Sequence, residues 1–171
     1  MIRRNRGVEL GVTLIELVIV IGATCVIIAV GVSGYRTYTI RREVIAGMQL
    51  AEHTKAAVAA AFTQSHDVPA DGAGLATYTQ GGLAKSGPFV ESIDVVDGRI
   101  DIVFGNGSQP AIADRRLSLT PYETAGLEIV WLCGNEIPGP GLEPLGFASG
   151  GRQPLQIATT VEARYLPSRC R

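Results

Sequence analysis

An uncharged, apolar run near the N-terminus constrains this chain more than any other feature. Residues 17–35 read LVIVIGATCVIIAVGVSGY and contain no Asp, Glu, Lys or Arg. A helix of about 19 residues is roughly 30 Å long, which matches the hydrocarbon core of a bilayer. We therefore expect this run to form a helix that lies in a membrane, and we expect the remaining chain, which is more polar, to fold in water.

Length and charge limit what the rest of the chain can be. The 171 residues suffice for one compact domain plus one additional element. The net charge is -1, so electrostatics give no reason to expect nucleic acid as the main partner. DNA binding is therefore possible but is not indicated by charge.

The residues before the apolar run set its orientation. Arg3, Arg4 and Arg6 precede it, so the positive-inside rule leaves the N-terminus in the cytoplasm and sends the rest of the chain outward. An ordinary secretory signal is cut after its apolar region, next to small residues, and no convincing A-x-A site follows here. We expect the apolar helix to be retained.

The segment in front of the apolar run resembles a known processing signal. Residues 11–20 read GVTLIELVIV, which is similar to the prepilin signature of type IV pilins and pseudopilins, where a dedicated peptidase cuts after the glycine on the cytoplasmic face. The resemblance implies that residues 1–11 are a leader ending at Gly11 and that Val12 is the N-methylated mature N-terminus. It also makes Glu16 the glutamate at the fifth mature position. Most of the family carries phenylalanine where this chain has Val12.

Further along, the resemblance is closer at some positions than at others. Tyr35 and Tyr38 fall where many type IVa pilins carry tyrosines, just beyond the membrane span. Ser33 stands where a helix-breaking proline is common, and Cys25 replaces a frequent glycine.

Glu16 is the one carboxylate in the apolar segment, and it needs a cation. Placing a carboxylate near the middle of a bilayer costs about 2.5 to 3.5 kcal/mol, and less near an interface. Cleavage after Gly11 creates a positive α-amino group at Val12. Glu16 can reach this amine within its own helix, or it can reach that of a neighbouring subunit, which would set the register of assembly. The alternative is that Glu16 only complements the dipole of its own helix.

Beyond the membrane the helix is expected to continue as an amphipathic element over residues 35–66, following the membrane and assembly helix of residues 12–34. Proline is absent until Pro69, and we expect the helix to end near His66. Apolar side chains recur at three- and four-residue steps, so one face can pack on a sheet. These positions are Ile40, Val44, Met48, Ala51, Val58 and Phe62. A coiled coil is the rival interpretation, but a sustained leucine heptad is missing.

Residues 67–171 are predicted to hold a loop, a sheet and a C-terminal disulfide region. Residues 69–88 are rich in glycine and alanine and read as a loop. Strands are expected at residues 89–96 and 99–104, joined by a tight turn at Asp97-Gly98, and at residues 116–120 and 127–133. The predicted fold is α+β: a long N-terminal helix, membrane-spanning in its first half, packed on an antiparallel sheet of about four strands.

The three cysteines divide by environment. Cys25 lies inside the apolar run and is read as a small residue packed in a helix. Cys133 and Cys170 form the plausible pair, and a disulfide between them requires an oxidising compartment, as for an exported domain. Their surroundings, WLCG and ARYLPSRCR, also resemble the C-terminal disulfide region of type IVa pilins. This second resemblance favours a pilus subunit over a secretion pseudopilin.

Catalytic and metal-binding patterns are not recognisable. His53 and His66 stand at no ligand spacing with a cysteine or with each other, and no phosphate-binding loop, nucleophile elbow or zinc-peptidase pair occurs. We expect neither an enzyme nor a cofactor. Arginines 152, 164, 169 and 171 form a basic group diluted by Glu143 and Glu162, and they are read as solvated surface rather than as a site for anionic partners.

The resemblance implies a structural subunit of a type IV pilus, serving adhesion, twitching motility or DNA uptake. Its partners would be other copies of the chain, a prepilin peptidase and the assembly machinery of the inner membrane. The head would lie in the periplasm before assembly, and the filament outside the cell. Two alternatives stay open: a minor pilin or type II secretion pseudopilin, and a single-span membrane protein with a periplasmic binding or enzymatic domain in which Glu16 is accidental.

Overall fold

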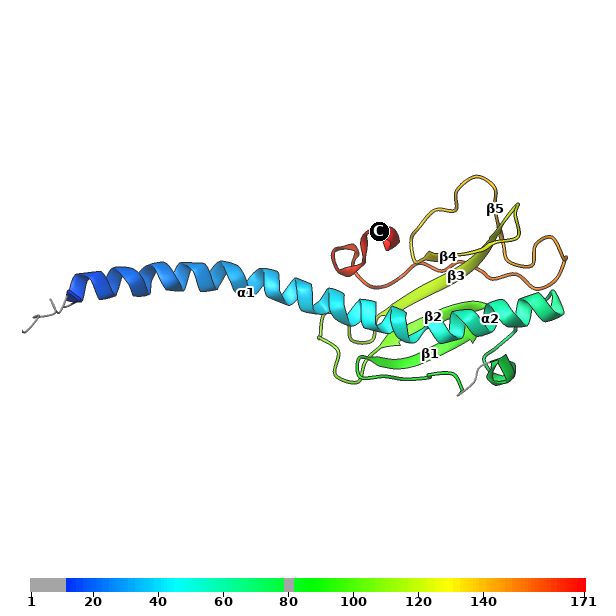
Figure 1. The fold of residues 1–171 in the computed structure, drawn as a ribbon, viewed down its shortest axis with the longest axis horizontal. Helices are drawn as coiled ribbons and strands as arrows, with labels where there is room; N and C mark the ends of the chain where they lie inside the picture. Colours follow the sequence, from blue (N-terminus) through cyan, green and yellow to red (C-terminus); the bar gives the residue numbers. More distant parts are fainter. Residues whose placement is uncertain (1–11, 79–81) are drawn as a thin grey trace, which may run out of the picture. The chain divides into compact units, whose positions relative to one another are not determined.

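The structure is a computed structural model that describes residues 12–78 and 82–171. It divides into two compact units, Met1–Arg36 and Thr37–Arg171. We describe each by itself and call the second unit the head. Figure 1 shows the ribbon with its elements labelled.

Two consecutive helices make up the N-terminal part of the chain. Helix α1 runs from Leu14 to Leu50 and α2 from Glu52 to Ser65. The interruption at Ala51 is slight, because Ala51 N–H still bonds to Gly47 O at 3.2 Å and Lys55 N–H to Ala51 O at 2.9 Å. His66 ends α2 in the left-handed conformation, with φ 55° and its N–H on Phe62 O. The predicted end near His66 is confirmed.

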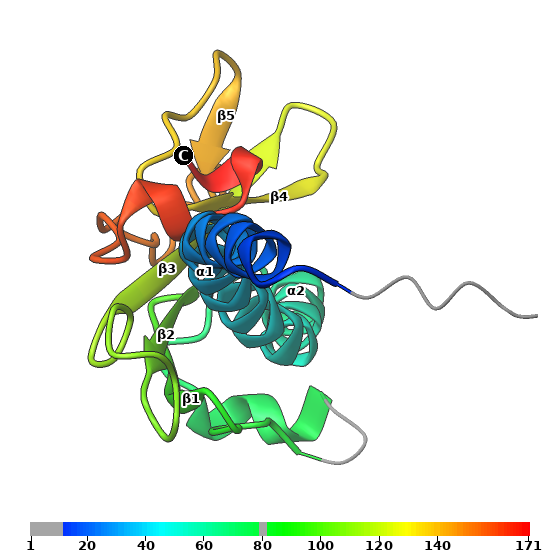
Figure 2. The same ribbon diagram turned by 90° about the vertical axis from the view of Figure 1, so that its left-hand side faces the viewer.

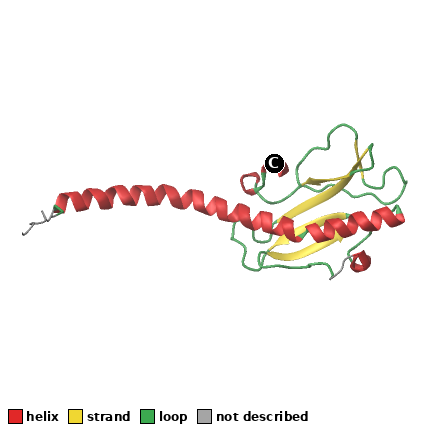
Figure 3. Cartoon of the chain, in the orientation of Figure 1, coloured by secondary structure: helices red, strands yellow, loops and turns green. Residues whose placement is uncertain are grey.

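Within the head, one face of the helices is buried. Ile40, Val44, Met48, Ala51 and Val58 are buried, as the three- and four-residue spacing predicted, and Phe62 is half-buried. This face packs on the sheet, whose own core side chains are dominated by Ile100, Ile102 and Phe104. Figure 3 shows the helices in red and the strands they cover in yellow.

The sheet is antiparallel and has five strands. The strands are β1 (Val90–Val96), β2 (Arg99–Phe104), β3 (Arg116–Thr124), β4 (Ile129–Cys133) and β5 (Leu142–Pro144). Their order is β1-β2-β3-β4, and β5 pairs with β3. The predicted α+β fold is confirmed, with five strands in place of about four.

The predicted hairpin lies at the turn between β1 and β2. Asp97 and Gly98 have φ values of 48° and 78°, the left-handed pair that a two-residue turn of this kind requires. Val96 pairs with Arg99 directly across the turn. The sequence motif therefore predicted both the turn and the register beside it.

Strand β3 is longer than predicted because it continues through Pro121. Ser118 O accepts from Gly134 N–H, and Thr124 N–H donates to Glu128 O, so these even-numbered residues of β3 turn their backbone groups toward β4. The backbone groups of Pro121 point to the opposite edge of β3. At that edge β3 pairs with β2 only up to Leu119 of β3, so β2 does not reach Pro121. Pro121 needs to offer only its carbonyl, which accepts from Leu145 N–H at 3.1 Å. A missing N–H costs nothing at this position, so the expected turn at Pro121 is wrong.

Two further short elements were not predicted. Strand β5 lies in a glycine- and proline-rich segment, and a 3-10 helix, Ala73–Tyr78, lies in the region expected to be a loop. The leucine of that 3-10 helix, Leu75, is fully buried and belongs to the core. Both elements are stabilised by tertiary contacts and carry no periodic pattern of their own.

The C-terminal segment crosses the face of the sheet opposite to α2, as Figure 2 shows in orange. Arg99 Nη1 donates to Leu155 O at 2.8 Å, and Tyr122 OH donates to Gln156 Oε1 at 3.0 Å. The chain then forms two 3-10 turns, Ala163–Tyr165 and Ser168–Cys170. The predicted disulfide closes the segment: Cys133 and Cys170 are bonded, 37 residues apart, with their Cα atoms at 5.1 Å.

Candidate functional site

The start of α1 is a capped helix terminus. Thr13 Oγ1 accepts a hydrogen bond from Glu16 N–H at 3.3 Å, and Thr13 O accepts from Leu17 N–H at 3.1 Å. Threonine followed three residues later by glutamate is the capping-box pattern, in which the threonine hydroxyl satisfies an otherwise free N–H of the first turn. Sequence reasoning missed this function of Thr13, although the T-x-x-E spacing is readable in the sequence.

Glu16 lies in the first turn of α1. A carboxylate there is favourable because the free N–H groups of the helix start carry partial positive charge. Glu16 forms no ion pair with any of the described residues. Val12 is 70% exposed and precedes the helix, while Gly11 lies outside the described residues. Glu16 is therefore positioned close to the place where a new N-terminus would arise, and its role in assembly stays a prediction.

The helix surface after Glu16 is apolar and uncovered. Eleven large apolar side chains between Val12 and Ile28 are each 53% to 81% exposed. α1 is the one helix in the described residues that is long and apolar enough to cross a membrane. Leaving eleven such side chains in water costs roughly 20 kcal/mol relative to burying them. This surface requires lipid or other apolar helices around it.

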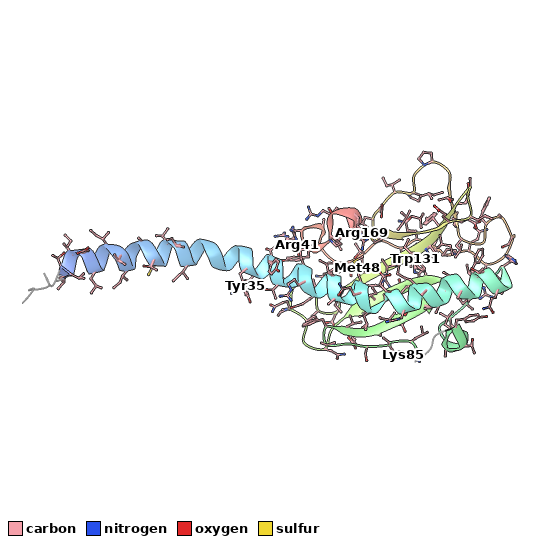
Figure 4. The ribbon with its side chains drawn as sticks, viewed as in Figure 1. Tyr35, Arg41, Met48, Lys85, Trp131 and Arg169 are labelled. Carbon is pink, nitrogen blue, oxygen red and sulfur yellow. A yellow bond between two sulfur atoms is a disulfide. The ribbon has the colours of Figure 1, made fainter. Side chains whose placement is uncertain are left out.

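The first turn of the head carries basic and aromatic side chains. Arg41 Nε donates to Arg164 O at 2.8 Å, which ties the C-terminal segment to α1. The guanidinium of Arg42 lies 5.9 Å from the ring centre of Tyr38. Figure 4 labels Tyr35 and Arg41 along this stretch of α1, with Arg169 on the C-terminal segment. The four arginines that the sequence grouped together do not form one patch, because Arg152 binds Asp97 instead, at 3.4 Å.

The single tryptophan lies on the strand that carries one cysteine of the disulfide. Trp131 is half-buried in β4, two residues before Cys133, and Lys55 Nζ of α2 lies 5.7 Å from its ring centre. Cys133 and Cys170 are both buried, and the 3-10 turn that carries Cys170 packs on β4. Trp131 is a residue of the sheet that packs against the core.

Residues with metal-binding side chains do not gather in the described part of the chain. In residues 12–78 and 82–171, no three of His, Cys, Asp and Glu lie close enough together to hold a metal ion. Cys25 is exposed on the apolar surface of α1 and has no disulfide partner. The features that stand out are therefore the capped, apolar helix and the disulfide-closed head.

Comparison with known proteins gives consistent matches over most of the chain. A family model described as Pilin (bacterial filament) matches residues 41–171. A Type IV major pilin protein PilE1 of Neisseria gonorrhoeae is 30% identical over 168 residues, which cover 94% of this chain and 73% of that protein. A fimbrial protein of Neisseria meningitidis is 28% identical over 94% of this chain and 93% of its own.

A third relative comes from another genus. The fimbrial protein EcpC of Eikenella corrodens is 27% identical, over 97% of this chain and 93% of its own length. The family model begins at residue 41, beyond the apolar run, whereas these alignments reach nearly the whole chain. The likeness therefore extends to the head as well as to the N-terminal helix.

Proposed function

The chain belongs to the pilin family of bacterial filament proteins, and we propose that it is a type IV pilus subunit that is cut after Gly11 and polymerises through its N-terminal helix. A prepilin peptidase would remove residues 1–11 and leave Val12, N-methylated, as the mature N-terminus. Before assembly the head would lie in the periplasm, and afterwards in an extracellular filament.

The exposed apolar surface of α1 carries this proposal. Its eleven large side chains are uncovered in the single chain, so the chain must hold them in lipid or against other copies of the same helix. A helix that is apolar all round suits both surroundings in turn. Inner-membrane assembly machinery would then transfer the helix from the bilayer to a bundle of identical helices.

Glu16 is the residue that we assign to register. A carboxylate in an apolar bundle is stabilised only when a cation lies beside it. The α-amino group that cleavage creates at Val12 of a neighbouring copy is such a cation, and it is available only if the two helices are staggered correctly. Assembly in any other stagger would leave Glu16 buried and unpaired.

Mass spectrometry of the N-terminus, on protein taken from cells with a working pilus machine, tests the processing step. The expected mature chain begins at Val12 and carries one methyl group on its amine. A chain that still begins at Met1 in these cells contradicts the proposal. It would favour a single-span membrane protein whose glutamate has no role in assembly.

Filament yield tests the role of Glu16. In Glu16→Gln, the head should fold and the helix should insert as before, but sheared filaments should be scarce. Glu128→Gln, which changes an exposed glutamate in the β3–β4 turn, serves as the matched control and should assemble normally. Wild-type yield in Glu16→Gln contradicts the register role.

The amount of the chain in sheared filaments separates a major subunit from the alternatives. A major pilin dominates such a preparation, whereas a minor pilin or a pseudopilin is scarce in it. The resemblance to type IV pilins implies that the filament supports adhesion, twitching motility or DNA uptake. Assays of a strain lacking the chain assign them one by one.

A further inference from the structure

The head begins with a cluster of arginines directly after the apolar run. Residues 36–42 read RTYTIRR, with three arginines and no acid. The fold adds a fourth from the far end of the sequence, because Arg41 Nε holds the carbonyl of Arg164 at 2.8 Å. We call Arg41, Arg42 and Arg164, which all belong to the head, the proximal arginines.

Two of the proximal arginines are paired with tyrosines and exposed. Arg42 lies 5.9 Å from the ring centre of Tyr38, and Arg164 lies 5.8 Å from that of Tyr165. The side chain of Arg164 is 68% exposed. Tyrosine and arginine together are typical of the boundary between hydrocarbon and water, where the ring is partly apolar and the guanidinium reaches the headgroups.

The two glutamates that neighbour the proximal arginines in the sequence do not balance their three positive charges. Glu43 is only 4% exposed, and its Oε2 already accepts the N–H of Gln109 at 2.8 Å. Glu162 binds Arg164 at 2.7 Å, as an exposed pair of the kind that is weak and easily exchanged. Arg41 and Arg42 form no ion pair with any residue in the described part of the chain.

The chain holds the proximal arginines near a membrane surface in any orientation of the head. Arg42 is seven residues from Tyr35, the end of the uncharged run, and seven residues span at most about 25 Å when fully extended. A weak site is sufficient under such a tether, because the local concentration of headgroups is high. Free duplex DNA has no such tether, and three cations would give it little affinity.

We propose that the proximal arginines bind the phosphates of anionic phospholipids in the leaflet that faces the head, and so hold the unassembled subunit against the membrane. The inference rests on the proposed membrane location of α1. If the leader is removed, Arg3, Arg4 and Arg6 are lost with it, and the arginines that flank the apolar run are then all on the head side. Each basic residue near an anionic surface strengthens binding by about fivefold.

Trp131, the only tryptophan, provides the measurement. The full chain is placed in nanodiscs of phosphatidylcholine alone, or of phosphatidylcholine and phosphatidylglycerol in equal parts, each with a trace of lipid carrying a dansyl headgroup. Energy transfer from Trp131 to dansyl then reports how often the head lies on the surface. Transfer should be higher in the anionic discs and should fall in about 1 M salt, where the Debye length is about 3 Å.

The variant Arg42→Gln with Arg164→Gln isolates the two exposed arginines. Its docking constant on anionic discs should fall roughly 25-fold, the product of two fivefold losses. Arg152→Gln changes an arginine that binds Asp97 at 3.4 Å, so it removes one exposed charge elsewhere and should behave as wild type. Circular dichroism melting of all three proteins checks that the head is folded.

Each outcome decides the proposal. Equal transfer in the two kinds of disc, or an unchanged double variant, overturns it. A double variant that loses binding to duplex DNA while lipid composition has no effect makes the surface a nucleic-acid site and also overturns it. Failure of the membrane location on which the inference rests looks different, because the chain would then not co-elute with discs of either composition. Failure of processing or assembly is seen instead in the N-terminal mass and in the filament yield.

Discussion

Gly47 of α1 lies directly against the ring of Phe104 in β2. A Cβ atom built on Gly47 would be 2.7 Å from Phe104 Cε1 and 3.2 Å from Val90 Cγ2. Both Gly47 and Phe104 are buried. The absence of a side chain at residue 47 therefore allows the helix to approach the sheet at the centre of the core.

Gly47→Ala should destabilise the head, even though alanine favours helix by about 1 kcal/mol. Overpacking a filled core costs about 1 to 3 kcal/mol, so we expect a small net loss. Urea unfolding followed by Trp131 fluorescence measures it. Gly74→Ala, where a Cβ meets nothing within 4 Å, should show no loss. The double variant Gly47→Ala with Phe104→Leu should lose less unfolding free energy than the sum of the losses in the two single variants, because the smaller side chain makes room for the added methyl group.

Replacing both Cys133 and Cys170 by serine should destabilise the head strongly. Opening a loop of 37 residues costs about 4 kcal/mol on the chain-entropy estimate, a large share of the stability of a small domain. The change in unfolding free energy in urea checks this. Cys25→Ser, which alters the exposed free cysteine of α1, should leave head stability unchanged. A head of equal stability in the double serine variant contradicts the prediction.

Arg99 and Asp101 form a buried ion pair on the outer face of the sheet. Three hydrogen bonds of 2.9 to 3.2 Å join them, and each residue is only 6% exposed. Asp101→Asn should cost about 3 to 5 kcal/mol, because it leaves the guanidinium buried without its counter-charge. Arg99→Met combined with Asp101→Leu should cost less than Asp101→Asn alone. A double variant that is less stable than the single one would show that the pair itself contributes net stability.

Burial raises the pKa of Tyr122 above its usual 10.0. In the unfolded chain this phenol ionises near pH 10, whereas in the head it ionises only at higher pH. The unfolded state therefore loses its proton first, so stability should fall as pH rises above about 10 and should be unaffected by this group below that. Melting temperatures between neutral and alkaline pH report the effect.

Tyr122→Phe provides the control for this pH dependence. It loses the hydrogen bond from Tyr122 OH to Gln156 Oε1, which costs about 1 kcal/mol at neutral pH. Above pH 10, however, its stability should decline less steeply than that of the wild type. Parallel pH profiles for the two proteins would mean that Tyr122 does not carry the alkaline loss.

Local patterns predicted the elements that local physics determines. The spacing of Ile40, Val44 and Met48 predicted the buried helix face, and Asp97-Gly98 predicted the hairpin, since a positive φ pair is a property of those two residues alone. The predicted turn at Pro121 was wrong because a proline interrupts a strand only where its missing N–H would have had a hydrogen-bond partner in a neighbouring strand. That is a property of the assembled sheet and not of the strand.

The proximal arginines were missed for a similar reason. Arg41 and Arg164 are 123 residues apart, and only the fold brings them together. The group that the sequence proposed, from Arg152 to Arg171, was defined by nearness along the chain, and the structure divides it. The cap at Thr13, unlike the proximal arginines, could have been predicted from the sequence, because the T-x-x-E spacing of Thr13 and Glu16 is local.

Thr13 lies on the mature side of the proposed cut, one residue beyond Val12. The Thr13 hydroxyl accepts the N–H of Glu16 in the first turn of α1. Removal of the leader would therefore leave the N-terminal cap of the helix in place. The proposed cut lies before α1, which begins at Leu14, so cleavage would not have to open the helix. Processing would change the charge at the start of α1 without removing any of its turns.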